Sequence, residues 1–395
     1  MRLGVIGYGA RARHMVQTMC AQDMDVRLVA IADPQGDAIR DRMRDVGEAE
    51  MPRFYATADE MLNGEPLDGV VIGTRCSLHA AMAIKVLSRD IAVYMEKPVA
   101  TTMPDLLALY DCCAFLRSPR IVVSFPLRMS RVVQLARQII TSGKIGEVEQ
   151  VRAWTNVPYG NVYFQTWYRD ESETQGLFLQ KATHDFDYIN YLLGDNRPRR
   201  ISAMTAKRVF QGNHPAGLRC MDCPERKTCF ESPYHPSRAE PLPLHQPAPE
   251  MCAFAVDTGN EDSGSALIEY ESGMHAVYSQ NFYTRGKAAR RGASFTGYHG
   301  TVEFDWYPEN LKVYLHHENR VETYDFEDTG GHGGGDAVLA TNFLEVIRGE
   351  AESVSPIENG LRNTLMCLKA KESAATRQFQ EIEWPAGRGV TERGR

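Results

Sequence analysis

The chain opens with a short apolar segment, residues 3–6, that runs directly into a glycine-rich turn. The turn has the pattern G-x-G-x-x-A, formed by Gly7, Gly9 and Ala12, and a segment with helical spacing follows it. The first glycine permits a tight turn, the second lets a pyrophosphate approach the backbone, and the small third residue lets the helix pack close to the strand. The N-terminus of that helix would face the phosphates. The pattern predicts a domain that binds a dinucleotide.

A second apolar segment, "VRLVAIADP", ends in Asp33. A carboxylate at this distance from the glycine turn accepts hydrogen bonds from the ribose hydroxyls of the adenosine and repels a 2′-phosphate. The next residues are Pro34, Gln35 and Gly36, so no arginine follows immediately to bind such a phosphate. The sequence therefore predicts NAD as the cofactor in preference to NADP.

Strand-like and helix-like segments alternate over the first third of the chain. Apolar segments at residues 68–74, 91–98 and 120–126 are separated by helical patterns at 77–89 and 103–116. This alternation predicts a doubly wound parallel sheet that binds its ligand beyond the carboxyl ends of the strands. Besides the glycine turn and Asp33, the residues expected to bind the cofactor at this edge are Ala10, Arg11, Thr74, His79, Glu96 and Lys97.

The size and charge of the chain restrict its class. At 395 residues it exceeds what one hydrophobic core usually serves, so two domains are expected. The 44 Lys and Arg residues against 51 Asp and Glu residues give a net charge of −7, which argues against a nucleic-acid-binding protein. No apolar run approaches the ~18 residues of a membrane span. Because the N-terminus enters the strand-and-turn pattern at once, we expect no signal peptide and a cytoplasmic protein.

Further motifs follow in a characteristic order: "VVIGTRCSLH", "EKPVATT", "GKIGEV", "LFLQKATHDFDYINYLLG" and "GGHGGGDAVLATNFLEVIRG". With the glycine turn, they resemble the Gfo/Idh/MocA oxidoreductases over residues 1–384. The resemblance implies an NAD-binding domain at residues 1–123 and an α+β domain at residues 124–384 with a large, open, mainly antiparallel sheet. Alternating segments between residues 147 and 326 fit such a sheet. It also implies a homodimer or homotetramer, and the tail at residues 385–395 is expected to be disordered.

The resemblance also implies a set of catalytic residues. Members of the family place a Lys, an Asp and a His at the reacting carbon, and here Lys97 and His184 match two of them. The expected Asp is replaced by Gln180, with Lys181 beside it, as in a subset of the family with a lysine three residues before the histidine. We expect Lys97 and His184 to contact the reacting hydroxyl, one of them as the base, with His184 titrating near neutral pH. Lys181 would tune their pKa or hold substrate oxygens.

A second group of residues is expected to bind the substrate. An arginine beside aromatic residues suits a polyol or an acidic sugar. The predicted residues are Arg128, Tyr163, Trp167, Arg169, Gln180 and Asp185. The basic run "RGKAARR" at residues 285–291 is interpreted as a solvated loop, with a positive rim of the substrate site as the alternative.

Four cysteines cluster in a proline-rich insertion at about residues 212–256. Cys220 and Cys223 form a C-x-x-C pair, Cys229 follows, and Cys252 stands after a long loop. Thiolates at this spacing suit a structural zinc ion, which would order a segment that has little apolar periodicity. His235 or His245 could replace Cys252 as a ligand. An iron–sulfur cluster and free thiols in a flexible loop are the alternatives.

Three functions are consistent with these features. The leading hypothesis is an NAD-dependent dehydrogenase of a sugar, an inositol or a sugar acid. The second is a redox-neutral glycosidase that oxidises the sugar transiently, eliminates the aglycone and returns the hydride. The third, a non-catalytic nucleotide or sugar sensor, is disfavoured because it would need neither Lys97 nor His184.

Overall fold

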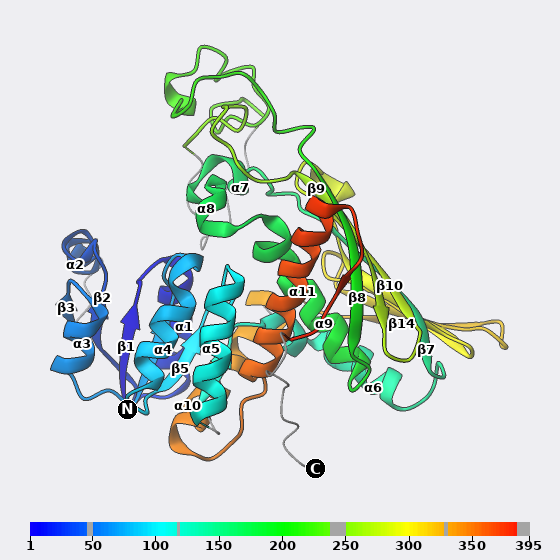
Figure 1. Cartoon of the computed structure of the whole chain (residues 1–395), viewed down its shortest axis with the longest axis horizontal. Coiled ribbons are helices and arrows are strands. Elements are labelled where there is room, and N and C mark those ends of the chain that lie inside the picture. The colour runs from blue at the N-terminus through cyan, green and yellow to red at the C-terminus, as the bar shows by residue number, and fades with distance from the viewer. Residues whose placement is uncertain (46–49, 117–118, 238–249, 328–330, 385–395) are drawn as a thin grey trace.

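A six-stranded parallel sheet forms the first part of the protein, with the strand order β3-β2-β1-β4-β5-β6 (Figure 1). The computed structural model describes residues 1–45, 50–116, 119–237, 250–327 and 331–384. The strands are β1 (Arg2–Ile6), β2 (Arg27–Ala32), β3 (Arg53–Tyr55), β4 (Gly69–Ile72), β5 (Ala92–Met95) and β6 (Ile121–Val123). The strand order reverses between β1 and β4, the position at which doubly wound sheets bind ligands. The predicted parallel sheet is confirmed, and the short strand β3 was not predicted.

Helices cover both faces of this sheet, which is why its central strands are nearly continuous apolar runs. Helices α4 and α5 pack on one face, and α1 and α10 pack on the other. The helices of this layer are α1 (Ala10–Gln22), α2 (Gly36–Asp45), α3 (Ala58–Gly64), α4 (His79–Leu87), α5 (Met103–Leu116) and α10 (Gly335–Arg348). No described helix is both long and apolar enough to cross a membrane.

The last two long helices return to the first sheet from the far end of the chain. Helix α10 contributes Phe343 to the core beside Tyr94 of β5. Helix α11 (Ile357–Thr376) contributes Leu361 to the hydrophobic core beside the first sheet and Met366 to the core beside the second sheet, described next. This one helix therefore packs against both parts of the protein. The division of the chain at residue 123 remains a prediction.

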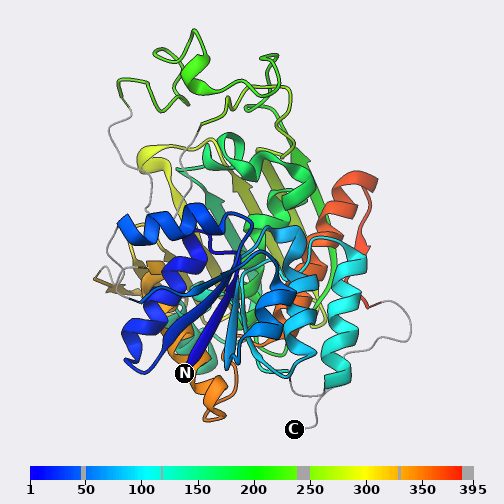
Figure 2. The same cartoon turned by 90° about the vertical axis from the view of Figure 1, so that its left-hand side faces the viewer.

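The second sheet has nine strands in the order β14-β13-β12-β11-β7-β10-β9-β8-β15. The strands are β7 (Val148–Asn156), β8 (Pro198–Ala206), β9 (Ser263–Tyr270), β10 (His275–Asn281), β11 (Arg290–Gly297), β12 (Gly300–Asp305), β13 (Asn310–Leu315), β14 (Arg320–Asp325) and β15 (Gln380–Glu381). Among the described strands of this second sheet, only the pairing of β7 with β10 is parallel. The predicted large, mainly antiparallel sheet is confirmed, and Figure 2 shows it behind the first sheet.

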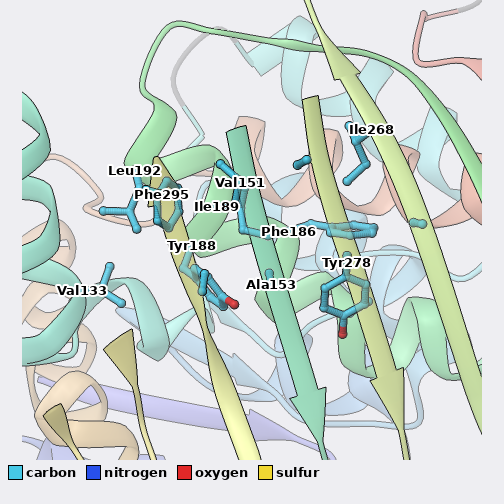
Figure 3. Packing of buried hydrophobic residues seen from close by; sticks show 14 of the residues in the cluster. Val133, Val151, Ala153, Phe186, Tyr188, Ile189, Leu192, Ile268, Tyr278 and Phe295 are labelled. Atoms are coloured by element: carbon cyan, nitrogen blue, oxygen red, sulfur yellow. The ribbon is translucent and has the colours of Figure 1, made fainter. Parts of the chain in front are cut away.

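Helix α9 (Thr183–Leu193) lies against the inner face of the second sheet. Phe186 and Ile189 of the helix pack with Val151 of β7 and Phe295 of β11 (Figure 3). Because α9 is buried almost all round, the polar side chains that it carries must find partners inside the protein. The remaining helices of this part are α6 (Arg131–Thr141), α7 (Val162–Gln165) and α8 (Glu171–Thr174).

The cysteine-rich insertion leaves the second sheet between β8 and β9 and forms the extension at the top of Figure 1. At its base, Asp262 accepts hydrogen bonds from the backbone N–H groups of residues 208, 209 and 210. Phe210 stacks on Phe164 of α7, with 4.1 Å between the ring centroids, and Ala253 joins the same apolar cluster. Aromatic packing and backbone hydrogen bonds therefore anchor the insertion, which the sequence alone did not indicate.

Candidate active site

The glycine turn lies at the carboxyl end of β1 and leads into α1. Gly7 has φ of +82°, and a Cβ at this position would lie 2.7 Å from the backbone nitrogen of Thr74, so only glycine fits. A Cβ at Gly9 would meet nothing closer than the carbonyl oxygen of Gly73 at 3.9 Å. The space before the N-terminus of α1 is therefore open for a phosphate group.

Asp33 lies at the carboxyl end of β2, and its carboxylate is held by two backbone groups. The N–H of Tyr8 donates to Oδ2 (2.8 Å), and the N–H of Gln35 donates to Oδ1 (2.8 Å). The carboxylate is thus fixed beside the glycine turn, as a ribose-binding residue requires. This geometry fits the predicted NAD site, and each cofactor contact remains a prediction.

Arg11, in the first turn of α1, ties the glycine turn to two other elements. Its guanidinium pairs with Glu96 after β5 (3.1 Å) and with Asp336 of α10 (2.6 Å). These carboxylates were not expected as its partners, because Asp336 lies far away in the sequence. Arg11 and Glu96 form an ion pair with each other, and their predicted contact with the cofactor remains a prediction.

His79 is buried between the segments that follow β4 and β5. Its Nδ1 lies 2.7 Å from the carbonyl oxygen of Pro98, and its Nε2 lies 3.2 Å from that of Thr74. Burial lowers the pKa of His79, so a neutral ring donates one hydrogen bond, and the shorter contact favours Pro98. The ring therefore links the two segments, and its cofactor contact is a prediction without support from this geometry.

Lys97 stands two residues beyond the end of β5, where the Lys97–Pro98 peptide is cis. Its Nζ donates a hydrogen bond to the backbone carbonyl of Gln180 (2.6 Å). Burial lowers the pKa of Lys97 to about 8, and the positive charges of Lys181 and Arg291 act in the same direction. A substantial fraction of Lys97 is thus neutral near physiological pH and can accept a proton.

The segment before α9, Phe178–Ala182, is π-helical. This wide turn presents the carbonyl of Gln180 to Lys97 and directs Lys181 elsewhere, to the hydroxyl of Tyr159 (2.8 Å). The side-chain Oε1 of Gln180 is buried without a hydrogen-bond partner among the described residues. Local π-helical turns often occur at functional sites, because they aim several consecutive side chains in different directions.

His184, in the first turn of α9, is 9% exposed and lies edge-on to the ring of Phe125. Its Nδ1 is buried and finds no hydrogen-bond partner in the described part of the chain. Burial lowers the pKa of His184 well below the usual value, and the charges of Lys97, Arg291 and Lys181 lower it further. The expectation that His184 titrates near neutral pH is therefore wrong: its ring is neutral there.

Asp185 is fully buried beneath the second sheet rather than facing an open space. Its Oδ2 accepts hydrogen bonds from Thr155 (2.9 Å) and Tyr278 (2.8 Å), and its Oδ1 accepts one from Nε of Arg291 (2.9 Å). Since three donors already hold this carboxylate, the predicted substrate contact of Asp185 finds no support here.

Arg291 is a residue of the site that the sequence interpretation missed. It was assigned to a solvated loop, yet it is 8% exposed, lies in β11 opposite Thr155 of β7 and faces α9. Ala293 and Phe295 of the same strand are buried as well. Extending their period-two pattern back by two residues would have placed Arg291 on the inner face.

Two more residues near the site were not predicted. Tyr159 contacts Lys181 as described above, and His332 has its ring 6.4 Å from that of His184. Nδ1 of His332 lies 3.0 Å from Oδ2 of Asp336, the carboxylate that also binds Arg11. The segment "GGHGGGD" was recognised as a motif, but its distance along the sequence from His184 concealed this proximity.

Two arginines predicted to bind substrate are engaged inside the protein. Arg128 is 2% exposed and forms a two-pronged ion pair with Asp187 of α9. Arg169 pairs with Asp257 at the base of the cysteine-rich insertion, and its charge acts on Cys252 there. Nε and Nη1 of Arg169 are buried without a hydrogen-bond partner among the described residues, whereas all three guanidinium nitrogens of Arg128 have partners. Substrate binding by both arginines remains a prediction, and only the contacts of Arg128 leave no donor for it.

Two aromatic residues predicted to bind substrate lie in one group of rings. Tyr163 is buried, with its ring 5.3 Å from that of Tyr168. Trp167 stacks on Tyr168 with 3.9 Å between centroids, and the guanidinium of Arg75 lies 3.9 Å from the centroid of the Trp167 ring. The arginine of this group, Arg75, was not among the predicted residues, and substrate binding by Tyr163 and Trp167 remains a prediction.

The predicted zinc site requires correction. Cys220, Cys223, Cys229 and Cys252 are free thiols, and no group of three or more His, Cys, Asp or Glu side chains among the described residues could hold a metal ion. Burial raises the pKa of Cys220 to about 11, and the other three thiols raise it further. The ring of His235 contacts Ser237, and His245 lies outside the described residues.

Comparisons with known proteins agree with this architecture. Residues 1–119 match the model of an oxidoreductase family with an NAD-binding Rossmann fold, and residues 133–303 match the GFO/IDH/MocA C-terminal domain. YteT of Bacillus subtilis is 28% identical over 326 residues, which cover 74% of this chain and 75% of YteT. Inositol 2-dehydrogenase of Leifsonia xyli is 25% identical over 195 residues, covering 49% of this chain and 54% of that enzyme. The structure of a levoglucosan dehydrogenase in complex with NADH and levoglucosan superposes with a TM-score of 0.75 at 18% identity, over 98% of this chain and all of that one, and so shares its fold.

Proposed function

Because the chain belongs to the Gfo/Idh/MocA oxidoreductase family, we propose that it is an NAD-dependent dehydrogenase of a sugar, an inositol or a sugar acid. The reaction moves a hydride between a hydroxyl-bearing carbon and nicotinamide C4. The names of the relatives support a cyclic polyol as substrate, since one is an inositol dehydrogenase and one structural neighbour was solved with levoglucosan and NADH.

The observation that most supports this proposal is that two groups able to exchange protons, Lys97 and His184, lie together at the edge of the first sheet. The charge of Lys97 acts on the pKa of His184; His184 is buried, and Lys97 is partly exposed. They come from different elements, the end of β5 and the start of α9. A purely structural pair would satisfy its hydrogen bonds internally, whereas Nδ1 of His184 has no partner in the described residues.

The cofactor would be held by the glycine turn and Asp33. The open space at Gly9 would take the pyrophosphate, and the fixed carboxylate of Asp33 would bind the adenosine ribose and disfavour NADP. When bound, NAD supplies the acceptor for the hydride. The residues of the chain must then bind and orient the substrate hydroxyl, exclude water and take its proton.

Lys97 would take that proton. Its neutral form keeps one hydrogen bond to the carbonyl of Gln180, which orients the amine, and the lone pair of Nζ is left for the substrate hydroxyl. Gln180 itself cannot accept a proton with its side chain, so it positions Lys97 rather than replacing the missing carboxylate. The neutral ring of His184 would hold the same hydroxyl by a hydrogen bond.

One assay separates the proposed function from its alternative. Purified protein is incubated with NAD and a panel of inositols, sugars, sugar acids and nitrophenyl glycosides, and NADH and nitrophenol are read together. NADH formation without nitrophenol release is the expected result. Nitrophenol release without net NADH would instead identify the redox-neutral glycosidase, and NAD binding with neither product would favour the sensor.

A further inference from the structure

Positive charge exceeds negative charge around the proposed reacting centre. Lys181 is 5% exposed and Arg291 is 8% exposed, and the charges of both act on Lys97. The carboxylate of Asp185 balances Arg291, and Glu96 is engaged by Arg11. Among the described residues, Lys97 and Lys181 have no carboxylate within ion-pair distance, and their hydrogen bonds go to a carbonyl and a phenol.

On the premise of the dehydrogenase function above, we propose that the substrate is an acidic sugar or polyol acid whose carboxylate is bound by Arg291 and Lys181. Its reacting hydroxyl would then lie at Lys97 and His184. Arginine matches a planar carboxylate through parallel N–H donors, and a lysine ammonium adds a compact point charge. The two cations come from β11 and from the segment before α9, so a ligand bound by both would join the sheet to the helix.

The hydrogen bonding of Arg291 supports this assignment. Its Nε donates to Oδ1 of Asp185, and its Nη2 lies 2.9 Å from the same oxygen but makes no hydrogen bond there. Nη2 is buried and has no other hydrogen-bond partner among the described residues. Asp185 cannot turn toward it, because Thr155 and Tyr278 hold its other oxygen. Nη2 thus has a carboxylate oxygen nearby but not aligned with its N–H groups, and a substrate oxygen would supply the hydrogen bond that Asp185 does not.

The surroundings of Lys181 also suit an anion. Its Nζ has one hydrogen bond, to Tyr159, and therefore keeps donor capacity. Lys181 and Arg291 together favour the ionised form of Tyr159, since both lower its pKa, so the field at this point attracts negative charge. The charge of Arg291 also acts on Tyr163 and Tyr307.

A neutral polyol would leave Lys181 without a counter-charge among the described residues. Its hydroxyls can accept hydrogen bonds from Arg291 and Lys181 but carry no charge, and bonds to a charged acceptor are stronger by roughly a factor of two. Burying a cation without a counter-charge is costly, so a bound carboxylate would gain the most from Lys181, with Arg291 adding hydrogen-bond donors. For the basic run at residues 285–291, the alternative interpretation was a positive rim of the substrate site. That interpretation is thus favoured for one residue of the run, Arg291.

The experiment compares acids with their neutral isosteres on the NADH-loaded protein. D-Glucuronate, D-galacturonate and D-gluconate are each titrated by calorimetry against the corresponding amide, with a sugar phosphate as a further arm. At least one acid should bind about 10-fold or more tightly than its amide. Lys181→Met and Arg291→Lys should each remove most of that preference. Arg290→Lys, at the neighbouring exposed position whose guanidinium pairs with Asp305, is the matched control and should retain it.

The outcomes separate this inference from the function on which it rests. Equal binding of acid and amide in every pair, no acid binding at all, a preference for the sugar phosphate, or undiminished preference in Lys181→Met would each overturn the carboxylate assignment. NADH formation is measured in parallel on acids and neutral polyols. If the protein oxidises neutral polyols and shows no preference for acids, only the carboxylate assignment is overturned. If it binds acids preferentially but forms NADH with no substrate, the proposed dehydrogenase function is overturned and the carboxylate-binding site stands.

Discussion

Two buried arginine–aspartate pairs meet helix α9, and they differ in how completely they are satisfied. Arg128 holds both oxygens of Asp187, and its remaining Nη1 lies 3.3 Å from a carbonyl and an amide oxygen. Arg291 reaches only one oxygen of Asp185, and its Nη2 has no hydrogen-bond partner in the described residues. Both arginines are buried, so burial and charge alone do not distinguish an architectural pair from a binding group.

For a buried charged residue, whether all its hydrogen-bond donors and acceptors have partners is therefore a better guide to function than its burial or its charge. A pair whose donors and acceptors all match contributes to the fold and has nothing left for a ligand. Open donors and acceptors near α9 include Nη2 of Arg291, Nδ1 of His184 and Oε1 of Gln180. The charge of Arg291 acts on Lys97, that of Lys97 acts on His184, and the carbonyl of Gln180 binds Lys97.

The largest effect is expected at Lys97. Lys97→Met should lower kcat for NADH formation by about 10²–10⁴-fold, because it removes the base that takes the hydroxyl proton. NADH affinity and the melting temperature should change little. The matched control is Lys85→Met, which removes a surface lysine paired with Asp59 and should leave kcat unchanged. Full activity in Lys97→Met would show that another group is the base.

The satisfied pair should respond in stability. Arg128→Met leaves Asp187 buried without its counter-ion and should destabilise the protein by about 3–5 kcal/mol, measured by denaturant unfolding. The exposed Arg131, replaced by Met, serves as control and should change the free energy of unfolding by less than about 0.5 kcal/mol. If Arg128→Met is as stable as the wild type but has a raised KM, the prediction that Arg128 contacts the substrate would be supported instead.

The pH dependence of oxidation tests the electrostatic coupling. With Lys97 as base at a pKa of about 8, kcat/KM for oxidation should fall about tenfold per pH unit below that value and level off above it. Lys181→Met removes a positive neighbour, so the pKa of Lys97 should rise and the inflection should move to higher pH. His184 is neutral throughout this range and should add no inflection near pH 6.5. An inflection that stays in place in Lys181→Met would contradict the coupling.

The smallest effect concerns cofactor choice. Replacing Asp33 by Ser removes the carboxylate that the N–H groups of Tyr8 and Gln35 hold. The ratio of kcat/KM for NAD over NADP should then fall by about tenfold, as expected for the loss of one charged hydrogen-bonding group. Steady-state kinetics with both cofactors measure the ratio. A wild-type preference for NADP would refute the assignment of Asp33.

The nucleotide half of the site was accessible from the sequence for a physical reason. Gly7, Asp33 and Lys97 each follow an apolar strand, and parallel strands bring their carboxyl ends to one edge, so local patterns suffice to place them together. His184 was found through a motif that the resemblance supplied. Its low pKa was not foreseeable, because that depends on burial in the folded protein and on cations from other segments of the chain.

The substrate half depended on contacts between distant segments. Arg291 is held by Asp185, and Arg128 by Asp187, more than fifty residues away in each case, and a basic run gives no sign of which arginine turns inward. The cysteine spacing suggested a metal because the anchoring contacts of Phe210 and Asp262 were not visible in the local pattern. The sequence therefore predicted the elements better than it predicted their partners.

The most direct test is single-turnover formation of NADH after mixing NAD-loaded protein with substrate, in the wild type, Lys97→Met and Arg128→Met side by side. NADH affinity and the melting temperature are measured on the same samples. The account predicts that Lys97→Met binds NADH normally but forms it at least about 100-fold more slowly. Arg128→Met should instead melt at a lower temperature and retain its rate per folded molecule. Equal rates in the wild type and Lys97→Met, or equal losses of rate in both variants, would contradict the account.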